Sequence, residues 1–145
     1  MSYFLNESTG EFERIFSDDF MYHVSATYLG MMPLFEPRVP RNAEYNCEDY
    51  TTKRICVSPT IKQCVLGIDG IQNIESTSLE VGCSWYVYRT LTKGVPAETI
   101  YDFETTEEHW IEEATRFQYF GRLHKISEND LAVFKKRKII FEFDC

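Results

Sequence analysis

Hydrophobic residues gather in several short runs that polar stretches separate, which predicts β-strands. Aromatic and β-branched residues, the types favoured in strands, gather at 20–24, 85–91 and 139–143. A further short apolar segment covers 54–57. Polar or turn-forming residues bound each segment, so the pattern predicts a sheet of short strands.

The clearest helix signal follows directly on the apolar segment at 54–57. Ser58 is a typical N-cap residue, and Pro59 suits the first helical position. Four apolar residues then follow at the spacing of one helix face: Ile61, Cys64, Val65 and Ile68. The sequence therefore predicts a helix from Pro59 to about Ile68 that buries these four side chains, with Gly67 or Gly70 at its end.

Two regions carry weaker signals. Prolines at 33, 37 and 40 break regular structure, so residues 31–53 are predicted to form a long ordered loop, and 69–82 are loop as well. Between 105 and 126 the chain is ambiguous, because Thr105-x-x-Glu108 resembles a helix capping box while Phe117 and Tyr119 alternate with polar residues as in a strand. Strands are the favoured interpretation of 107–126.

These elements predict the α+β class: a single compact domain with a mixed or antiparallel sheet and one or two short helices. A length of 145 residues, of which 43% are hydrophobic and 26% charged, suits one hydrophobic core. Residues 1–17 are polar with scattered phenylalanines and are predicted to be a partly ordered lead-in. The domain proper is expected at 18–145.

Cysteine spacing, apolar runs and net charge limit the binding partners and the cellular compartment that we expect. The five cysteines are odd in number and never spaced as Cys-x-x-Cys, which favours reduced thiols and argues against a zinc site. Because there is no leader-like apolar stretch and no apolar run long enough to cross a bilayer, we expect a cytoplasmic protein without a membrane partner. A net charge of −8 disfavours direct binding to nucleic acid.

Positive charge is concentrated around the proline-rich loop and the predicted helix start, at Arg38, Arg41, Lys53 and Arg54. The first turn of a helix presents unpaired N–H groups, so Ser58 beside Arg54 would seat a phosphate or carboxylate. This predicts a small anionic ligand. The alternative is that Ser58 only caps its helix and that the arginines pair with nearby carboxylates.

Negative charge is concentrated between 95 and 115, where seven acidic residues occur without any Lys or Arg: Glu98, Asp102, Glu104, Glu107, Glu108, Glu112 and Glu113. One such carboxylate could act as a general base or hold a ribose hydroxyl. The alternative is a solvated acidic face, which could also fit a basic groove on a partner protein. The three histidines have no metal-ligand spacing, so no metal is expected.

Four segments together resemble small uncharacterised proteins of bacteria and their phages, and look like a reduced ADP-ribosyltransferase-like fold. They are Tyr22-His23-Val24-Ser25, Pro37-Arg38-Val39-Pro40, the segment from Lys53 to Ile61 that contains Ser58-Pro59-Thr60, and the segment from Thr105 to Ile111. The resemblance covers roughly 20–126, which is most of the predicted domain.

The resemblance implies NAD or an ADP-ribose-like nucleotide as the ligand. In that family a first-strand histidine contacts the adenosine ribose, an aromatic ring stacks on nicotinamide, and a late glutamate holds the nicotinamide ribose. His23 and Ser25 match the first feature, Tyr86 or Tyr88 the second, and Glu107 or Glu108 the third. Glu107 is then the catalytic candidate, with Arg38, Arg54 and Ser58 on the anionic groups. The competing hypothesis is a non-enzymatic, phage-type inhibitor that uses the acidic segment.

Overall fold

The computed structural model describes residues 2–4, 19–40, 49–69, 78–125, 127 and 139–143. In this part the strands are β1 (Ser2–Phe4), β2 (Met21–Ser25), β3 (Leu34–Phe35), β4 (Ile55–Val57), β5 (Ser84–Thr90), β6 (Val95–Pro96), β7 (His109–Ile111), β8 (Thr115–Arg116), β9 (Gln118–Lys125) and β10 (Ile139–Phe143). The helices are α2 (Ile61–Asp69) and α3 (Phe103–Thr106). Ser2–Phe4, within the lead-in predicted at 1–17, thus forms a strand of a sheet. The rest of this lead-in lies outside the described residues.

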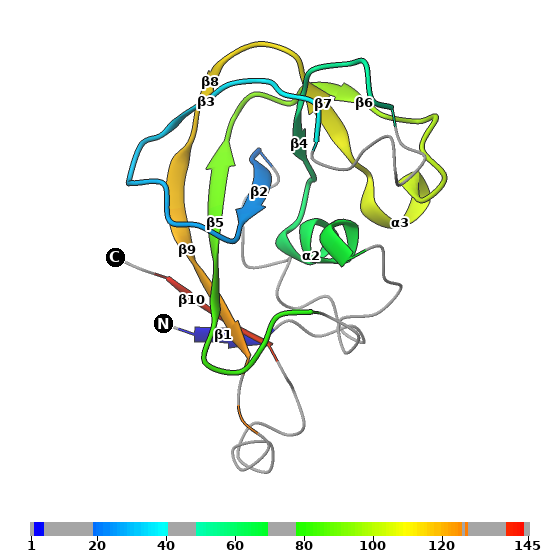
Figure 1. The fold of residues 1–145 in the computed structure, drawn as a ribbon. Helices are drawn as coiled ribbons and strands as arrows, with labels where there is room; N and C mark the ends of the chain where they lie inside the picture. Colours follow the sequence, from blue (N-terminus) through cyan, green and yellow to red (C-terminus); the bar gives the residue numbers. More distant parts are fainter. Residues whose placement is uncertain are drawn as a thin grey trace.

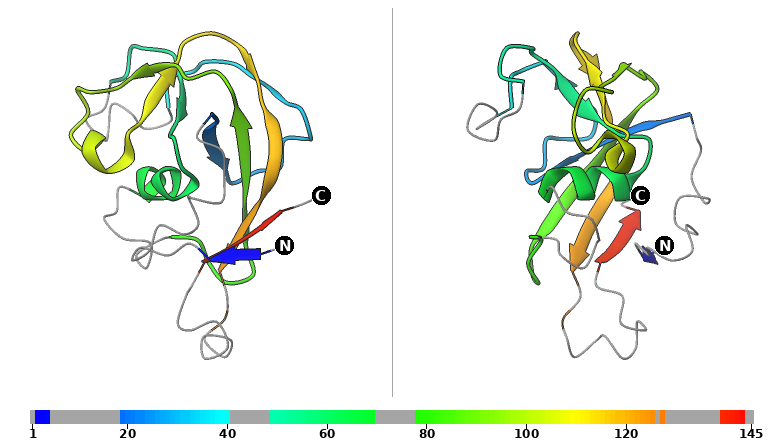
Figure 2. Two further views of the ribbon diagram at one scale, coloured as in Figure 1. Left: turned by 180° about the vertical axis from the view of Figure 1, so that it is seen from behind. Right: turned by 90° about the vertical axis from the view of Figure 1, so that its right-hand side faces the viewer.

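The strands form three antiparallel sheets (Figure 1). The large sheet has the order β1-β10-β9-β5-β2, a three-stranded sheet has the order β4-β7-β6, and β3 pairs with β8. Helix α2 lies across the large sheet, as Figure 2 shows from the side. The predicted α+β class with an antiparallel sheet and short helices is confirmed.

Strand β5 separates two hydrophobic clusters because its side chains alternate between the two faces of the large sheet. Val87 faces the first cluster and Tyr88 the second, and neither side chain is exposed. The first cluster lies between the sheet and α2: Tyr22, Val24, Ile61, Cys64, Val65, Leu66, Leu79, Val87, Leu123 and Ile139. The second lies between the sheet and β4, β7 and the β8–β9 segment: Met21, Ile55, Val57, Tyr88, Ile111, Phe117 and Tyr119.

Helix α2 follows β4 as the sequence predicts, but it begins at Ile61 rather than Pro59. Thr60 is the residue that caps it, since its Oγ1 accepts a hydrogen bond from the backbone N–H of Gln63 at 3.1 Å and donates one to the Gln63 side chain. Thr60-x-x-Gln63 has the sequence pattern of a capping box, and the Thr60 hydroxyl makes the N-cap hydrogen bond of that motif. The cap predicted at Ser58 lies two residues too early.

Three of the four side chains predicted on the buried face of α2 are buried, at Ile61, Cys64 and Val65. Ile68 was predicted wrongly, because it is 48% exposed, and Leu66 is buried in its place. The helix continues through Gly67, which lies against Thr106 of α3. The periodicity of a sequence does not show how much of a helix a sheet covers. Here the sheet does not cover the last turn of α2.

The favoured interpretation of 107–126 as strands is confirmed by β7, β8 and β9. The Thr105-x-x-Glu108 capping box is absent, because Thr105 lies inside α3, and that helix ends at Thr106. Glu107 then adopts a left-handed conformation with φ of 46° and closes the helix through its N–H to the Phe103 carbonyl. The loop predicted at 31–53 contains the short strand β3 in its described part.

Gly94 has a backbone conformation and a close contact that both require glycine. Its φ is +70°, and a Cβ built there would lie 2.6 Å from the backbone oxygen of Trp110. Gly94→Ala is therefore expected to lower the free energy of unfolding by about 1–3 kcal/mol in urea titrations. Gly82→Ala is the matched control, because Gly82 has φ of +88° and no atom lies within 4 Å of where its Cβ would be. Equal losses in the two variants would contradict the contact with Trp110.

Candidate functional site

The site predicted from the sequence lies around one edge of β4. The backbone groups of Arg54, Cys56 and Ser58 point toward the same edge because hydrogen-bonding directions alternate along a strand. At one end Ser58 exchanges two hydrogen bonds with Tyr22 of β2, of 2.8 and 3.0 Å. At the other end Arg54 exchanges two with Arg38, of 3.0 and 3.2 Å. In the described part of the chain, the backbones of β2 and of the segment just after β4 are bridged at Tyr22 and Ser58, and the stretch between the two strands beside this bridge is the β2–β4 split.

The imidazole of His23 occupies the place where β2 and β4 separate. Its Nδ1 lies 2.8 Å from the Cys56 carbonyl oxygen, which is the next acceptor along the β4 edge. A carbonyl only accepts, so Nδ1 carries the proton and, in the neutral ring, Nε2 is an acceptor. The ring packs edge-on against Phe35 at 5.1 Å and Phe117 at 6.2 Å. A histidine side chain therefore replaces a backbone hydrogen bond between the two strands.

Burial keeps His23 neutral. It lowers the pKa of the imidazole below its ordinary value of 6.5, the hydrogen bond to Cys56 opposes this, and the positive charge of Arg38 lowers the pKa further. The unfolded chain therefore binds a proton at a higher pH than the folded chain does. Stability from neutral His23 is present above pH 6.5 and is lost as the pH falls below that value.

This linkage predicts a melting temperature that falls on acidification from about pH 7.5 to about pH 5.5. His23→Gln, which keeps a donor for the Cys56 carbonyl but does not titrate, is expected to flatten that dependence. His109→Gln, which removes a histidine elsewhere in the fold, serves as the control. Melting curves for the three proteins across this pH range test the point, and an unchanged slope in His23→Gln would contradict it.

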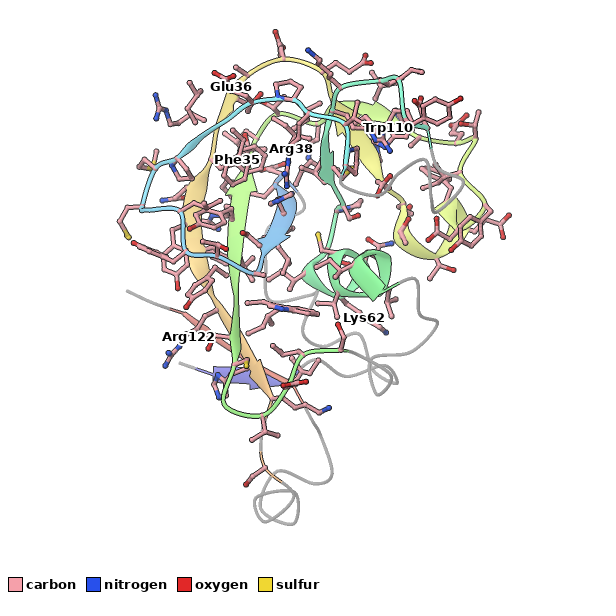
Figure 3. The ribbon with its side chains drawn as sticks, in the orientation of Figure 1. Phe35, Glu36, Arg38, Lys62, Trp110 and Arg122 are labelled. Carbon is pink, nitrogen blue, oxygen red and sulfur yellow. The ribbon has the colours of Figure 1, made fainter. Side chains whose placement is uncertain are left out.

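Arg38 places a positive charge beside the β2–β4 split. Its backbone is held by the hydrogen bonds with Arg54, and its side chain is exposed. Its positive charge lowers the pKa of His23. Within the described part of the chain, its guanidinium makes no hydrogen bond or ion pair. Figure 3 places Arg38 beside Phe35, over β2. A guanidinium has five N–H donors, which could contact a ligand.

Arg54 lies beside Arg38 but points its side chain elsewhere. It is buried, its NH1 donates to the carbonyl oxygens of Asp49 and Thr52 at 2.8 and 3.0 Å, and the guanidinium lies 4.3 Å from the ring centre of Trp110. These contacts hold the loop before β4. Anion binding by Arg54 stays a prediction, and none of these contacts supports it.

The carboxylate of Asp49 fixes the same loop. It accepts hydrogen bonds from the backbone and hydroxyl groups of both Thr51 and Thr52. Those bonds, the ones from Thr52 first, hold the pKa of Asp49 well below its usual range. Hydrogen bonds to Asp49 therefore hold the loop that ends at Arg54, and sequence composition does not predict them.

Ser58 is buried, and its backbone is paired with Tyr22. Its hydroxyl lies against the thiol of Cys64, whose pKa burial raises to about 12 and whose Sγ donates to the Tyr22 carbonyl. Ser58 therefore joins β2, β4 and α2 rather than capping the helix. Its predicted contact with a ligand has no geometric support.

Ser25 and Tyr86 are direct partners in the β2–β5 ladder, two residues along from the pair His23 and Tyr88. The four side chains thus share one face of the sheet. Tyr86 is half-buried and makes an edge-on contact with Tyr28 at 5.6 Å. Tyr88 is fully buried and its hydroxyl accepts from a backbone N–H. Of the two aromatic alternatives, only Tyr86 has a ring edge near solvent.

Glu107 lies between α3 and β7, the strand that pairs with the other edge of β4. Its exposed carboxylate accepts a 2.5 Å hydrogen bond from Nε2 of Gln63, in the first turn of α2. The alternative residue, Glu108, is half-buried and accepts a bond from the Trp110 indole. No contact in the described part of the chain joins either carboxylate to His23. The structure therefore brings together His23, Ser25, Arg38 and Tyr86, but not Glu107.

Three further observations concern the described residues. Among them, no group of three or more His, Cys, Asp or Glu side chains is placed to hold a metal ion. None of the helices in that part of the chain is long and apolar enough to cross a membrane. Cys56, Cys64 and Cys83 are not in disulfides, while Cys47 and Cys145 lie outside the described residues.

Comparison with known proteins adds no relative. No family model matches the chain, and searches of the curated proteins and of the solved structures give no significant match. The residues themselves are therefore the basis for any functional assignment.

Proposed function

We propose that the chain binds a small anionic ligand of nucleotide type, such as NAD or ADP-ribose, where β2 separates from β4. The observation that carries this proposal is the neutral imidazole of His23, wedged between the strands beside the available guanidinium of Arg38. Ser25 and Tyr86 continue the same face of the sheet away from the split.

The hydrogen-bonding groups of His23 and Arg38 favour a particular kind of ligand. Neutral His23 offers an acceptor at Nε2, so it suits a hydroxyl group such as those of ribose. Arg38 presents a planar fork of donors that matches two oxygens of a phosphate. A ligand that carries both groups, a ribose phosphate, satisfies both side chains at once. A bare anion satisfies only Arg38.

Catalysis by an ADP-ribosyltransferase-like reaction is the further part of the proposal. It requires a carboxylate at the reacting ribose, and Glu107 is the candidate on the chain. Its strained backbone, with φ of 46°, is compatible with a functional position. Because Glu107 contacts Gln63 of α2 and no contact in the described part of the chain joins it to His23, turnover requires a ligand long enough to span both residues.

A thermal-shift titration with NAD and ADP-ribose tests binding. A ligand at about 100 times its Kd stabilises the folded state by about 2.7 kcal/mol, which moves the melting temperature by several degrees. Glu107→Gln is expected to keep this shift and, if NAD is turned over, to stop the release of nicotinamide. No shift with either compound would contradict the proposal.

A second candidate function is a non-enzymatic interaction through the acidic segment. The supporting observation is that Tyr101 is 90% exposed among exposed carboxylates, of which Glu98 and Glu104 are two. An aromatic ring within a negative surface suits a basic protein groove. Anisotropy titration with a labelled arginine-rich peptide tests this, with E98K/E104K expected to lose binding and Arg38→Ala expected to keep it.

A further inference from the structure

A small cavity at the opposite end of the large sheet is separate from the β2–β4 split. It has a volume of about 230 Å³ and is lined by Gly82, Cys83, Ser84, Arg122, His124 and Lys125. The segment before β5 and the end of β9 form it side by side, through the pair Ser84 with His124 and the bridge between Val81 and Lys125. Figure 3 shows Arg122 at the lower end of β9, away from Arg38.

The lining of this cavity is unusual for an acidic chain. The protein has a net charge of −8, yet the described residues that line the cavity include Arg122, Lys125 and an imidazole and no carboxylate. In the described part of the chain, the Lys125 ammonium and the Ser84 hydroxyl have no hydrogen-bond or ion-pair partner. Two described acids lie near this lining: Glu142 is opposite Arg122 on β10, and the Glu80 carbonyl accepts from the N–H of Cys83, whereas Lys125 is opposite Ile139.

We propose that this cavity is a second anion site, which takes the phosphate group of a small molecule. Its lining includes three kinds of donor group: the guanidinium of Arg122, the ammonium of Lys125 and the hydroxyl of Ser84. A tetrahedral oxyanion has acceptors in several directions, whereas a carboxylate accepts mainly in one plane. The site does not depend on the proposed nucleotide function.

Titration with inorganic phosphate, followed by amide NMR, tests the site directly. Phosphate up to roughly 10 mM is expected to give saturable shifts at Gly82, Cys83 and Ser84. Lys125→Gln and Arg122→Gln remove one charge each and are expected to weaken the affinity about tenfold or more. The matched control is Arg116→Gln, which removes the same charge from the exposed surface of β8.

The thiol of Cys83 provides a second measurement, since it is exposed and lines the cavity. Phosphate is expected to slow alkylation of Cys83 without changing the rate at Cys56, as read by peptide mass spectrometry. Shifts confined to residues near Arg38 would overturn this second site while leaving the nucleotide proposal intact. Unsaturable drifts over many surface amides, or unchanged affinity in both Gln variants, would also overturn it.

Discussion

Phe117→Ala is expected to lower the free energy of unfolding by about 3–5 kcal/mol, the usual loss for a large aromatic side chain removed from a core. Phe117 is completely buried between β8 and β9, and its ring stacks on Phe35 with a centre-to-centre distance of 4.5 Å. It also packs against His23. Domains of this size are stable by about 5–15 kcal/mol, so urea titration should show a variant close to losing its fold.

Tyr101→Ala is the matched control for this loss. Its ring is 90% exposed, so its removal should change stability by no more than about 0.5 kcal/mol. A loss at Phe117 of less than about 1 kcal/mol would mean that the second cluster is not packed as described.

Arg38→Ala is expected to weaken the binding of ADP-ribose by more than tenfold in calorimetric titrations. Loss of a charge-assisted hydrogen bond costs about 1.5–3 kcal/mol, and the guanidinium at the split can make two such bonds to one phosphate. Arg38→Lys keeps the charge but loses the planar fork, so it should fall between the wild type and the alanine variant. The backbone pairing with Arg54 is available to alanine as well.

Arg116→Ala is the control for Arg38, because it removes the same charge from another exposed position. Its NH1 contacts the Met32 carbonyl on the outer surface, away from His23. Equal weakening in the two variants would indicate a general effect of net charge and would contradict a specific contact at Arg38.

Three strands could be predicted from sequence because their composition favours strands. Met21–Ser25, Ser84–Thr90 and Ile139–Phe143 form where aromatic and β-branched residues gather. Strand β3 could not be predicted, because its pairing with β8 depends on residues about eighty positions away and it lies among prolines. The cap of α2 was misplaced since Ser58 satisfies the local rule, yet β2 pairs with it instead.

The candidate site was only partly predictable, for a related reason. His23, Ser25 and Tyr86 share a face because strand alternation and antiparallel pairing place them there. The contact of His23 with the Cys56 carbonyl depends on how β2 and β4 diverge, and no local sequence pattern encodes this. Arg54 looked like a ligand contact because a sequence shows its charge but not that Asp49 and Thr52 engage its guanidinium.

The most direct test of the proposed site is the imidazole nitrogen spectrum of His23 with and without ADP-ribose. In the free protein near pH 7 we expect the proton on Nδ1, held by the Cys56 carbonyl, and an unprotonated Nε2. Saturating ADP-ribose should shift the Nε2 resonance of His23 and leave His109 unchanged. An unchanged His23 resonance at saturation, or a proton on Nε2 in the free protein, would contradict ligand binding at the split.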